Sequence, residues 1–181
     1  MDTPAPIVAV YGSSAAEPAT PVYRSALVLG RLLAKRGAVV ACGGYGGVME
    51  AVSRGARQAG GRVIGYTVAA WTERRPNQYL SEEHRCADLY ERLRCLIDGS
   101  RAMVALGGGI GTLVEVLLAW NLLFTGMLPP RPLIVVGREW ARTLAALSDF
   151  LEVGPHHLRY LCQCDHVEEA VERLQREGVL P

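Results

Sequence analysis

The chain has 181 residues, half of them hydrophobic and 20% charged, with a formal net charge of +1. These values fit one soluble globular domain over residues 1–181, and they give no basic surface for nucleic acid or for a membrane. No apolar run approaches the roughly 20 residues that a membrane-spanning helix needs. The first residues lack the basic-then-apolar order of a signal peptide, so we expect a cytoplasmic protein.

Apolar runs of strand length alternate with helical patterns along the chain. Strands are predicted over residues 7–10, 38–42, 62–66, 102–106 and 132–136, with a further short strand at 85–88. Helices are predicted over residues 22–36, 48–59, 89–99, 116–124 (with Glu115 about one turn into the helix), 138–150 and 167–177. This alternation predicts an α/β fold, a doubly wound parallel sheet flanked by helices.

Irregular structure is predicted between several of these elements. The segments are residues 17–21, 67–83, 125–130 and 152–164. A loop as long as 67–83 is typical of a lid or a binding loop, and we expect it to be mobile without ligand. Asp165 is the predicted N-terminal cap of the last helix. Leu89 is predicted to face inward from the helix over residues 89–99.

The lysine and cysteine content limits the chemistry. Lys35 is the sole lysine and lies at a predicted helix end, which argues against pyridoxal phosphate chemistry through a lysine amine. The five cysteines are odd in number and scattered, so we expect reduced thiols. Near the C-terminus lie potential metal ligands at a spacing unlike familiar zinc sites, and we favour a structural role without metal for this group: Cys162, Cys164, His166, His156 and His157.

Turns at three predicted strand ends are candidates for ligand binding. After the first strand, Gly12 permits close backbone approach and Ser13 offers a hydroxyl, although a plain turn explains these residues equally well. The second turn is glycine-rich to a degree that packing alone does not explain: Gly43, Gly44, Gly46 and Gly47.

The third turn, at residues 107–112, contains four glycines and a threonine and leads into a helix. Exposed amides and a helix dipole make such a turn a seat for phosphate. Glu115 is the sole acid in this apolar stretch, and we expect it to carry the chemistry. A Gly-Lys-Ser/Thr sequence is missing, and the glycines do not fit the G-x-G-x-x-G spacing. A mononucleotide or a sugar phosphate therefore fits better than a triphosphate or a dinucleotide.

Residues 107–115 resemble the P-G-G-x-G-T-x-x-E signature of the lonely-guy (LOG) family. Residues 43–49, together with 60–65, are similar to the other glycine block of that family, and Glu91-Arg92 falls where its E-R-K motif lies. The similarity extends in order from about residue 7 to residue 174. Before this resemblance is considered, an arginine on a helix such as Arg92 is more often a solvated charge.

The resemblance implies a Rossmann-like fold and hydrolysis of the N-glycosidic bond of a purine nucleoside 5′-monophosphate, cytokinin-type nucleotides included. The products are the free base and ribose 5-phosphate, and no metal or organic cofactor takes part. It also implies a homodimer. Arg92 and Glu115 correspond to the catalytic pair, and the phosphate seat corresponds to Gly108, Gly109, Gly111 and Thr112. The other candidate ligand-binding residues are Gly12, Ser13, Gly43, Gly44, Gly46, Gly47 and Met49.

Two positions depart from the LOG pattern. Gly107 replaces the proline of the signature, and Leu93 replaces the lysine that follows the arginine. The second change removes a positive charge near Arg92. Because relatives of this family include a carrier of molybdenum cofactor, the alternative function is binding of a nucleotide or phosphorylated cofactor without turnover.

Overall fold

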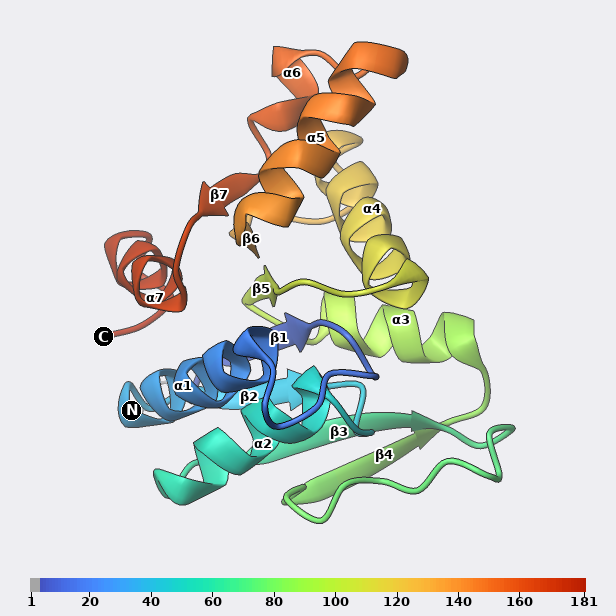
Figure 1. The fold of residues 1–181 in the computed structure, drawn as a ribbon, viewed down its shortest axis with the longest axis vertical. Coiled ribbons are helices and arrows are strands. Elements are labelled where there is room, and N and C mark those ends of the chain that lie inside the picture. The colour runs from blue at the N-terminus through green and yellow to red at the C-terminus, as the bar shows by residue number, and fades with distance from the viewer. Residues whose placement is uncertain (1–3) are drawn as a thin grey trace.

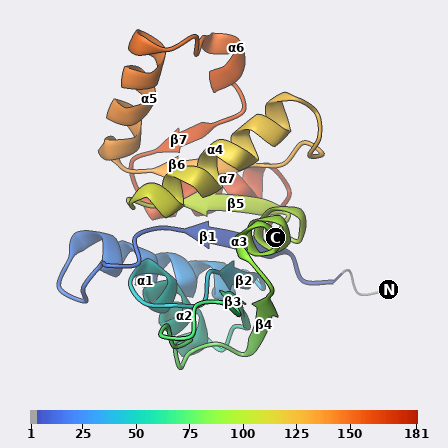
Figure 2. The same cartoon turned by 90° about the vertical axis from the view of Figure 1, so that its right-hand side faces the viewer.

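A computed structural model of the protein describes residues 4–181. Seven parallel strands form one sheet in the order β4-β3-β2-β1-β5-β6-β7, and helices cover both of its faces (Figures 1 and 2). The strands are β1 (Ile7–Tyr11), β2 (Val39–Cys42), β3 (Val63–Val68), β4 (Glu82–Cys86), β5 (Ala102–Ala105), β6 (Leu133–Val136) and β7 (Cys162–Cys164). The helices are α1 (Pro21–Lys35), α2 (Val48–Gln58), α3 (Leu89–Asp98), α4 (Ile110–Phe124), α5 (Arg138–Phe150), α6 (Pro155–Leu158) and α7 (Val167–Arg176).

The core consists of two apolar layers, one on each face of the sheet. Alternate residues of β1 point to opposite faces, so that Val8 and Val10 pack with α1, α2 and α7, whereas Ala9 and Tyr11 pack with α3, α4 and α5. All four of these side chains are buried. Burial on both faces is the reason that the central strands are continuous apolar runs rather than alternating ones. The predicted doubly wound Rossmann-like fold is confirmed.

Strand β1 lies at the centre of the sheet, paired in parallel with β2 on one side and β5 on the other. The chain leaves β1 toward α1 on one face and leaves β5 toward α4 on the opposite face. This divergence opens a crevice at the carboxyl ends of the two strands, the usual ligand position in open α/β sheets. In residues 4–181, the helices are too short or too polar to span a membrane.

The sheet edges differ most from the sequence-based prediction. β3 continues to Val68 and β4 occupies residues 82–86, so the connecting loop spans 69–81 rather than 67–83. The segment 152–164, predicted to be irregular, contains α6 and the edge strand β7. β7 has three residues and is defined by its pairing with β6, a partner that local sequence does not reveal.

Two predictions about side chains are wrong. Leu89 is 42% exposed rather than inward, because it is the first residue of α3 and lies beyond the packed part of that helix. The N-cap of α7 is His166 rather than Asp165. The backbone amide of Asp165 instead donates to Glu169 Oε2 at 3.0 Å, so a side chain from within the helix satisfies the group before the cap.

Candidate functional site

A cavity of about 290 Å³ lies in the crevice between the carboxyl ends of β1, β2 and β5. All three turns that the sequence singled out contribute to its wall. The lining residues are Val10, Tyr11, Gly12, Ser13, Ser14, Ala15, Gly43, Tyr45, Met49, Trp71, Arg74, Arg92, Gly109, Ile110, Gly111, Thr112 and Glu115. Segments that are distant in sequence therefore form one site at the topological switch point.

The turn after β1 connects the other two turns. The amide of Ser13 donates to the carbonyl of Gly107 at 3.1 Å, and the amide of Val48 donates to the carbonyl of Ser13 at 2.8 Å. Gly12 is required for this packing, since a Cβ at that position would lie 2.5 Å from Cγ1 of Val48. The glycine thus brings the start of α2 against the exit of β1.

The turn after β2 supports the arginine of the site. A Cβ at Gly43 would collide with the guanidinium of Arg92, so glycine is needed for the close approach of that side chain. Gly44 and Gly47 have φ values of +79° and +68°, which favour glycine for conformational reasons. The sulfur of Met49 lies 3.9 Å from Nη2 of Arg92. This turn therefore shapes the surroundings of Arg92.

The third turn presents the N-terminus of α4 to the cavity. Gly109 is the N-cap residue, and no side chain caps the helix. The first amides of a helix have no partner within it, and here Ile110, Gly111 and Thr112 line the cavity. Among helices of ten or more residues in 4–181, α4 alone lacks both a side-chain cap and an acid in its first turn. Its partial positive charge is thus available to an anionic ligand.

Arg92 of α3 and Glu115 of α4 form a buried ion pair beside these amides. Arg92 is 6% exposed and Glu115 is 7% exposed, and Nη1 of the arginine lies 3.3 Å from Oε1 of the glutamate. The Nε of Arg92 also donates to the carbonyl of Tyr66 at 2.8 Å, at the end of β3. Each guanidinium nitrogen thus has a nearby partner: Tyr66 O, Glu115 Oε1 or the Met49 sulfur.

Burial raises the pKa of Glu115 to about 7, although the nearby positive charge of Arg92 acts in the opposite direction. Removal from water disfavours the charged carboxylate more than the arginine stabilises it. A carboxyl group with a pKa near neutrality accepts and releases a proton readily under physiological conditions. The pair thus combines a fixed positive charge with a group that can transfer protons.

The structure brings most of the sequence-predicted site residues to this cavity. Those that line it are Gly12, Ser13, Gly43, Met49, Arg92, Gly109, Gly111, Thr112 and Glu115. Gly44, Gly46, Gly47 and Gly108 do not line it. Gly108 packs instead against Thr112 and the turn at Ser13, where a Cβ would lie 2.7 Å from Cβ of Thr112 and 2.9 Å from the amide nitrogen of Ser13.

Sequence reasoning missed Tyr45, Trp71 and Arg74, all of which line the cavity. Tyr45 is the non-glycine residue of the turn at 43–47, and the other two belong to the loop 69–81. The sequence signal that could have identified Trp71 and Arg74 is the presence of a single tryptophan and an arginine in a long polar loop. Residues of this kind in a loop after a parallel strand merit consideration as ligand contacts.

The two departures from the LOG pattern lie outside the cavity lining. Leu93 is buried at 6% exposure, and as the neighbour of Arg92 on a helix it points in a different direction. Gly107 accepts the hydrogen bond from Ser13, and a Cβ there would meet Cγ2 of Val22 at an ordinary 3.8 Å. Neither substitution disturbs the contacts of Arg92 or Glu115 described above.

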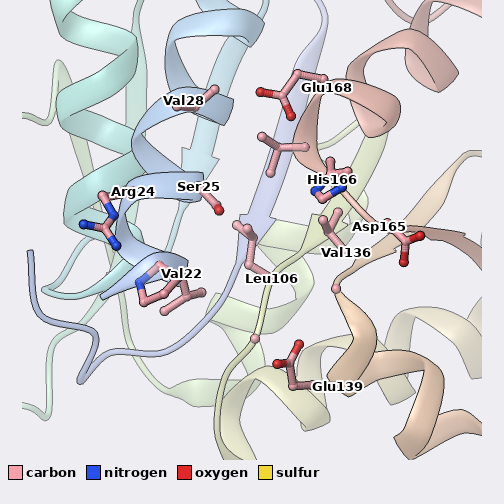
Figure 3. Close-up of a pocket in the computed structure, with 14 residues that line it drawn as sticks. Val22, Arg24, Ser25, Val28, Leu106, Val136, Glu139, Asp165, His166 and Glu168 are labelled. Atoms are coloured by element: carbon pink, nitrogen blue, oxygen red, sulfur yellow. The ribbon is translucent and has the colours of Figure 1, made fainter. Parts of the chain in front are cut away.

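A second hollow, of about 500 Å³, lies between α1 and α7, and Gly107 is among its lining residues (Figure 3). Its floor is apolar and includes Leu106 and Val136, whereas polar side chains stand at its rim. The charged residues of this rim are Arg24, Glu139, Asp165 and Glu168, all exposed. Residues 4–181 contain no group of three or more His, Cys, Asp or Glu side chains placed to hold a metal ion.

The model of the SLOG cluster4 family matches residues 5–136, which is more than half of the chain. This chain belongs to the SLOG cluster4 family. A protein named cytokinin riboside 5′-monophosphate phosphoribohydrolase from Mycobacterium tuberculosis is 31% identical over 167 residues, covering 84% of this chain and 87% of that protein. The resemblance to the LOG family is therefore confirmed.

Other relatives cover the chain to different extents. An uncharacterised protein of Archaeoglobus fulgidus is 33% identical over 97 residues, a match that spans 54% of this chain and 63% of that protein. The molybdenum cofactor binding protein of Rippkaea orientalis superposes with a TM-score of 0.77 at 26% identity, covering 98% of this chain and 99% of that one. The structural-genomics protein TM1055 has a TM-score of 0.75 at 35% identity, with 94% and 99% coverage. Both solved structures superpose on nearly the whole of this chain.

Proposed function

We propose that this protein is a cytoplasmic enzyme that hydrolyses the N-glycosidic bond of a purine nucleoside 5′-monophosphate, with cytokinin-type nucleotides among its substrates. The observation that carries the proposal is the buried pair of Arg92 and Glu115 beside the uncapped N-terminus of α4. The 31% identity to a mycobacterial protein named for this activity supports it. Products would be the free base and ribose 5-phosphate.

The arrangement suits this reaction in two ways. The amides of Ile110, Gly111 and Thr112 provide a place for the 5′-phosphate, which fixes the ribose close to the ion pair. Breaking the bond from the base nitrogen to the anomeric carbon develops positive charge on the ribose, and the carboxylate of Glu115 stabilises that charge. The same carboxylate accepts a proton from the water that adds to the anomeric carbon, and this proton then passes to the departing base, so the carboxylate is regenerated.

Arg92 holds the reacting carboxylate in position. Its contacts to the carbonyl of Tyr66 and to Glu115 come from different directions, which fixes the guanidinium. Its positive charge maintains a fraction of Glu115 in the ionised form despite burial. An arginine in this place also offers donors to the ligand.

The direct test is incubation of the purified protein with AMP and with an N6-modified analogue. Chromatography detects the free base, and a colorimetric assay detects ribose 5-phosphate. We expect both products in equal amounts. Ligand binding without either product would contradict the proposed hydrolysis of these nucleotides.

The second candidate function is binding of a phosphorylated cofactor without turnover. The observation that favours it is the likeness to the molybdenum cofactor binding protein of Rippkaea orientalis, at a TM-score of 0.77. The phosphate seat serves such a ligand as well as it serves a nucleotide. Under this alternative, the isolated cofactor would bind more tightly than AMP, and AMP would remain intact.

We further propose that two copies of the chain associate through α4. Ile110, Val114, Leu117 and Phe124 are 77%, 40%, 38% and 39% exposed, and their spacing places them along one side of the helix. Ile110 also lines the cavity, so a second copy against this stripe would close one side of the site. Sedimentation analysis of Leu117→Asp should show a shift from dimer to monomer; a monomeric unmodified protein would contradict the proposal.

A further inference from the structure

An aromatic wall lies on one side of the cavity, and the proposed chemistry at Arg92 and Glu115 makes no use of it. Trp71 comes from the loop 69–81, and Tyr45 comes from the turn after β2. Their ring centroids are 5.7 Å apart at an interplanar angle of 45°, and both residues line the cavity. Two rings from separate segments thus form one apolar surface within a polar site.

Hydrogen bonds hold this wall in place. The phenol of Tyr45 accepts a hydrogen bond from the amide of Val68 at 2.8 Å. Asn77 links the loop to the glycine turn through two hydrogen bonds. Its backbone amide donates to the carbonyl of Gly44 at 2.8 Å, and its side-chain Nδ2 donates to the carbonyl of Tyr45 at 3.0 Å. The loop and the turn are thereby fixed to one another. These hydrogen bonds therefore position both aromatic rings at the cavity.

A planar cation already covers the tryptophan ring. The guanidinium carbon of Arg74 lies 4.4 Å from the centroid of Trp71 and 5.9 Å from that of Tyr45. Arg74 is exposed and also lines the cavity, and no hydrogen bond or ion pair to another residue is found for its side chain within residues 4–181. A guanidinium and a flat heterocycle both bind to the face of an aromatic ring, so the two compete for Trp71.

The wall is close to the proposed reacting groups. The guanidinium carbon of Arg92 lies 5.8 Å from the centroid of Trp71, and Arg92 is paired with Glu115. Under the proposed function, the phosphate lies at the N-terminus of α4 and the glycosidic bond lies near that pair, which leaves the part of the cavity beside Trp71 and Tyr45 for the base. Trp71 is the largest aromatic surface that lines the cavity.

We infer that Trp71, supported by Tyr45, is the platform on which the base of the nucleotide stacks, and that the Arg74 guanidinium holds this place until the base displaces it. The inference rests on the proposed function, since it assigns the base subsite of the same cavity. Stacking makes the platform selective for planar heterocycles while it tolerates substituents at the edge of the ring, such as an N6 group.

The test compares a ligand that has a base with one that lacks it. Calorimetry measures the dissociation constants of AMP and ribose 5-phosphate in a Glu115→Gln background, in which AMP remains intact. We expect Trp71→Ala to weaken AMP binding roughly tenfold or more, the usual loss of one base–aromatic stack, and to leave ribose 5-phosphate binding within about twofold. Trp71→Phe should retain most of the affinity for AMP, and Arg74→Ala should not weaken it.

Fluorescence provides an independent readout. The chain has three tryptophans, and Trp120 and Trp140 are 6% and 7% exposed, whereas Trp71 is half-buried in the cavity wall. In the same Glu115→Gln background, which is the parent protein here, AMP should therefore quench the tryptophan emission. It should leave the emission of the Trp71→Phe variant unchanged, and ribose 5-phosphate should have little effect on either protein. Arg75→Ala, in the same loop but outside the cavity lining, is the matched control and should behave as the parent protein does.

The outcomes separate the two proposals. If neither AMP nor ribose 5-phosphate binds the parent protein, the proposed function fails and the platform fails with it. If AMP binds, and Trp71→Ala either weakens the binding of AMP and ribose 5-phosphate equally or changes the binding of neither, then the platform is wrong and the proposed function stands. If Arg74→Ala weakens AMP as much as Trp71→Ala does, Arg74 contacts the nucleotide directly and is not a placeholder.

Discussion

The two hollows at the carboxyl edge of the sheet differ in a way that size does not explain. The hollow between α1 and α7 is the larger, at about 500 Å³ against about 290 Å³ for the cavity at the switch point. Helix N-termini border both of them: α2 and α4 border the smaller, and α1, α5 and α7 border the larger. Helix ends alone therefore do not distinguish a phosphate site.

The difference lies in what already neutralises those helix ends. In the larger hollow, Glu139 and Glu168 lie in the first turns of α5 and α7, and the Thr20 side chain caps α1. These groups satisfy the partial positive charge before any ligand arrives. α4 has neither device, and its acid, Glu115, lies farther along the helix and is buried against Arg92. An available helix end next to a buried ion pair distinguishes the smaller cavity.

The largest expected effect comes from exchanging one acid in each hollow. Glu115→Gln should lower the rate of AMP hydrolysis by about 10²–10³-fold or more, because it removes the carboxylate that stabilises charge in the transition state. AMP binding should change little. Glu139→Gln, the matched change in the larger hollow, should leave the rate within about twofold. Steady-state kinetics measure both variants, and an active Glu115→Gln enzyme would exclude Glu115 from its proposed role.

Removal of one arginine from each hollow should separate a buried charge from an exposed one. Arg92→Ala leaves Glu115 buried without its cation, so the free energy of unfolding should fall by about 3 kcal/mol at pH 8. The loss should be smaller at pH 6, where a carboxyl group with a raised pKa is largely protonated. Arg24→Ala should change stability by less than about 0.5 kcal/mol. Urea denaturation at the two pH values tests this, and equal losses for both variants would be inconsistent with the buried pair.

An acid placed in the first turn of α4 should convert it to the type of helix end found in the larger hollow. A Cβ at Gly111 meets no atom within 4 Å, so Gly111→Asp fits without steric conflict. We expect AMP binding to weaken by about tenfold, because the carboxylate competes with the phosphate for the helix dipole and repels it. Gly111→Asn has the same shape without the charge and is the control. If both variants bind AMP equally well, the phosphate lies elsewhere.

The last prediction, of a size similar to that expected for Gly111→Asp, is a pH dependence of the rate that follows the ionisation of Glu115. Burial raises the pKa of Glu115 to about 7, so the group is mainly protonated below pH 7 and mainly ionised above it. If the carboxylate is the active form, kcat/KM should rise about tenfold from pH 6 to pH 8. The phosphate of AMP also ionises over this pH range. Measuring AMP binding to Glu115→Gln from pH 6 to pH 8 gives the contribution of the phosphate alone, which can then be distinguished from that of Glu115. A rate that falls with pH would indicate that the protonated acid acts instead.

Local sequence predicts the central part of the molecule well. The apolar runs of β1, β2, β5 and β6 are buried on both faces, which gives a strong signal for strands, and each begins and ends within one residue of its predicted position. The edges are less predictable. β7 exists because Cys162–Cys164 pairs with β6, and β4 carries four exposed residues of its five, so neither has a hydrophobic pattern of its own.

The candidate site shows the same division. The sequence pointed to Arg92, Glu115 and the three turns through motif spacing, and the structure brings nine of the predicted residues to one cavity. The sequence did not identify Trp71 or Arg74, because a loop without hydrophobic periodicity does not indicate which other segment its residues will contact. Conversely, Gly44 and Gly47 belong to the motif for their backbone conformation and not for contact with the cavity.

The sequence by itself determined the doubly wound fold, the three turns at the strand ends and the residue types that suit phosphate and proton transfer. These properties depend on local hydrophobic pattern and glycine placement, which act over a few residues. The tertiary structure alone decided that Arg92 and Glu115 are buried against each other, that the pKa of Glu115 is near 7, and that Trp71 lies over the cavity. Burial and the juxtaposition of distant segments depend on the packing of the whole chain, and those two quantities set the chemistry of the site.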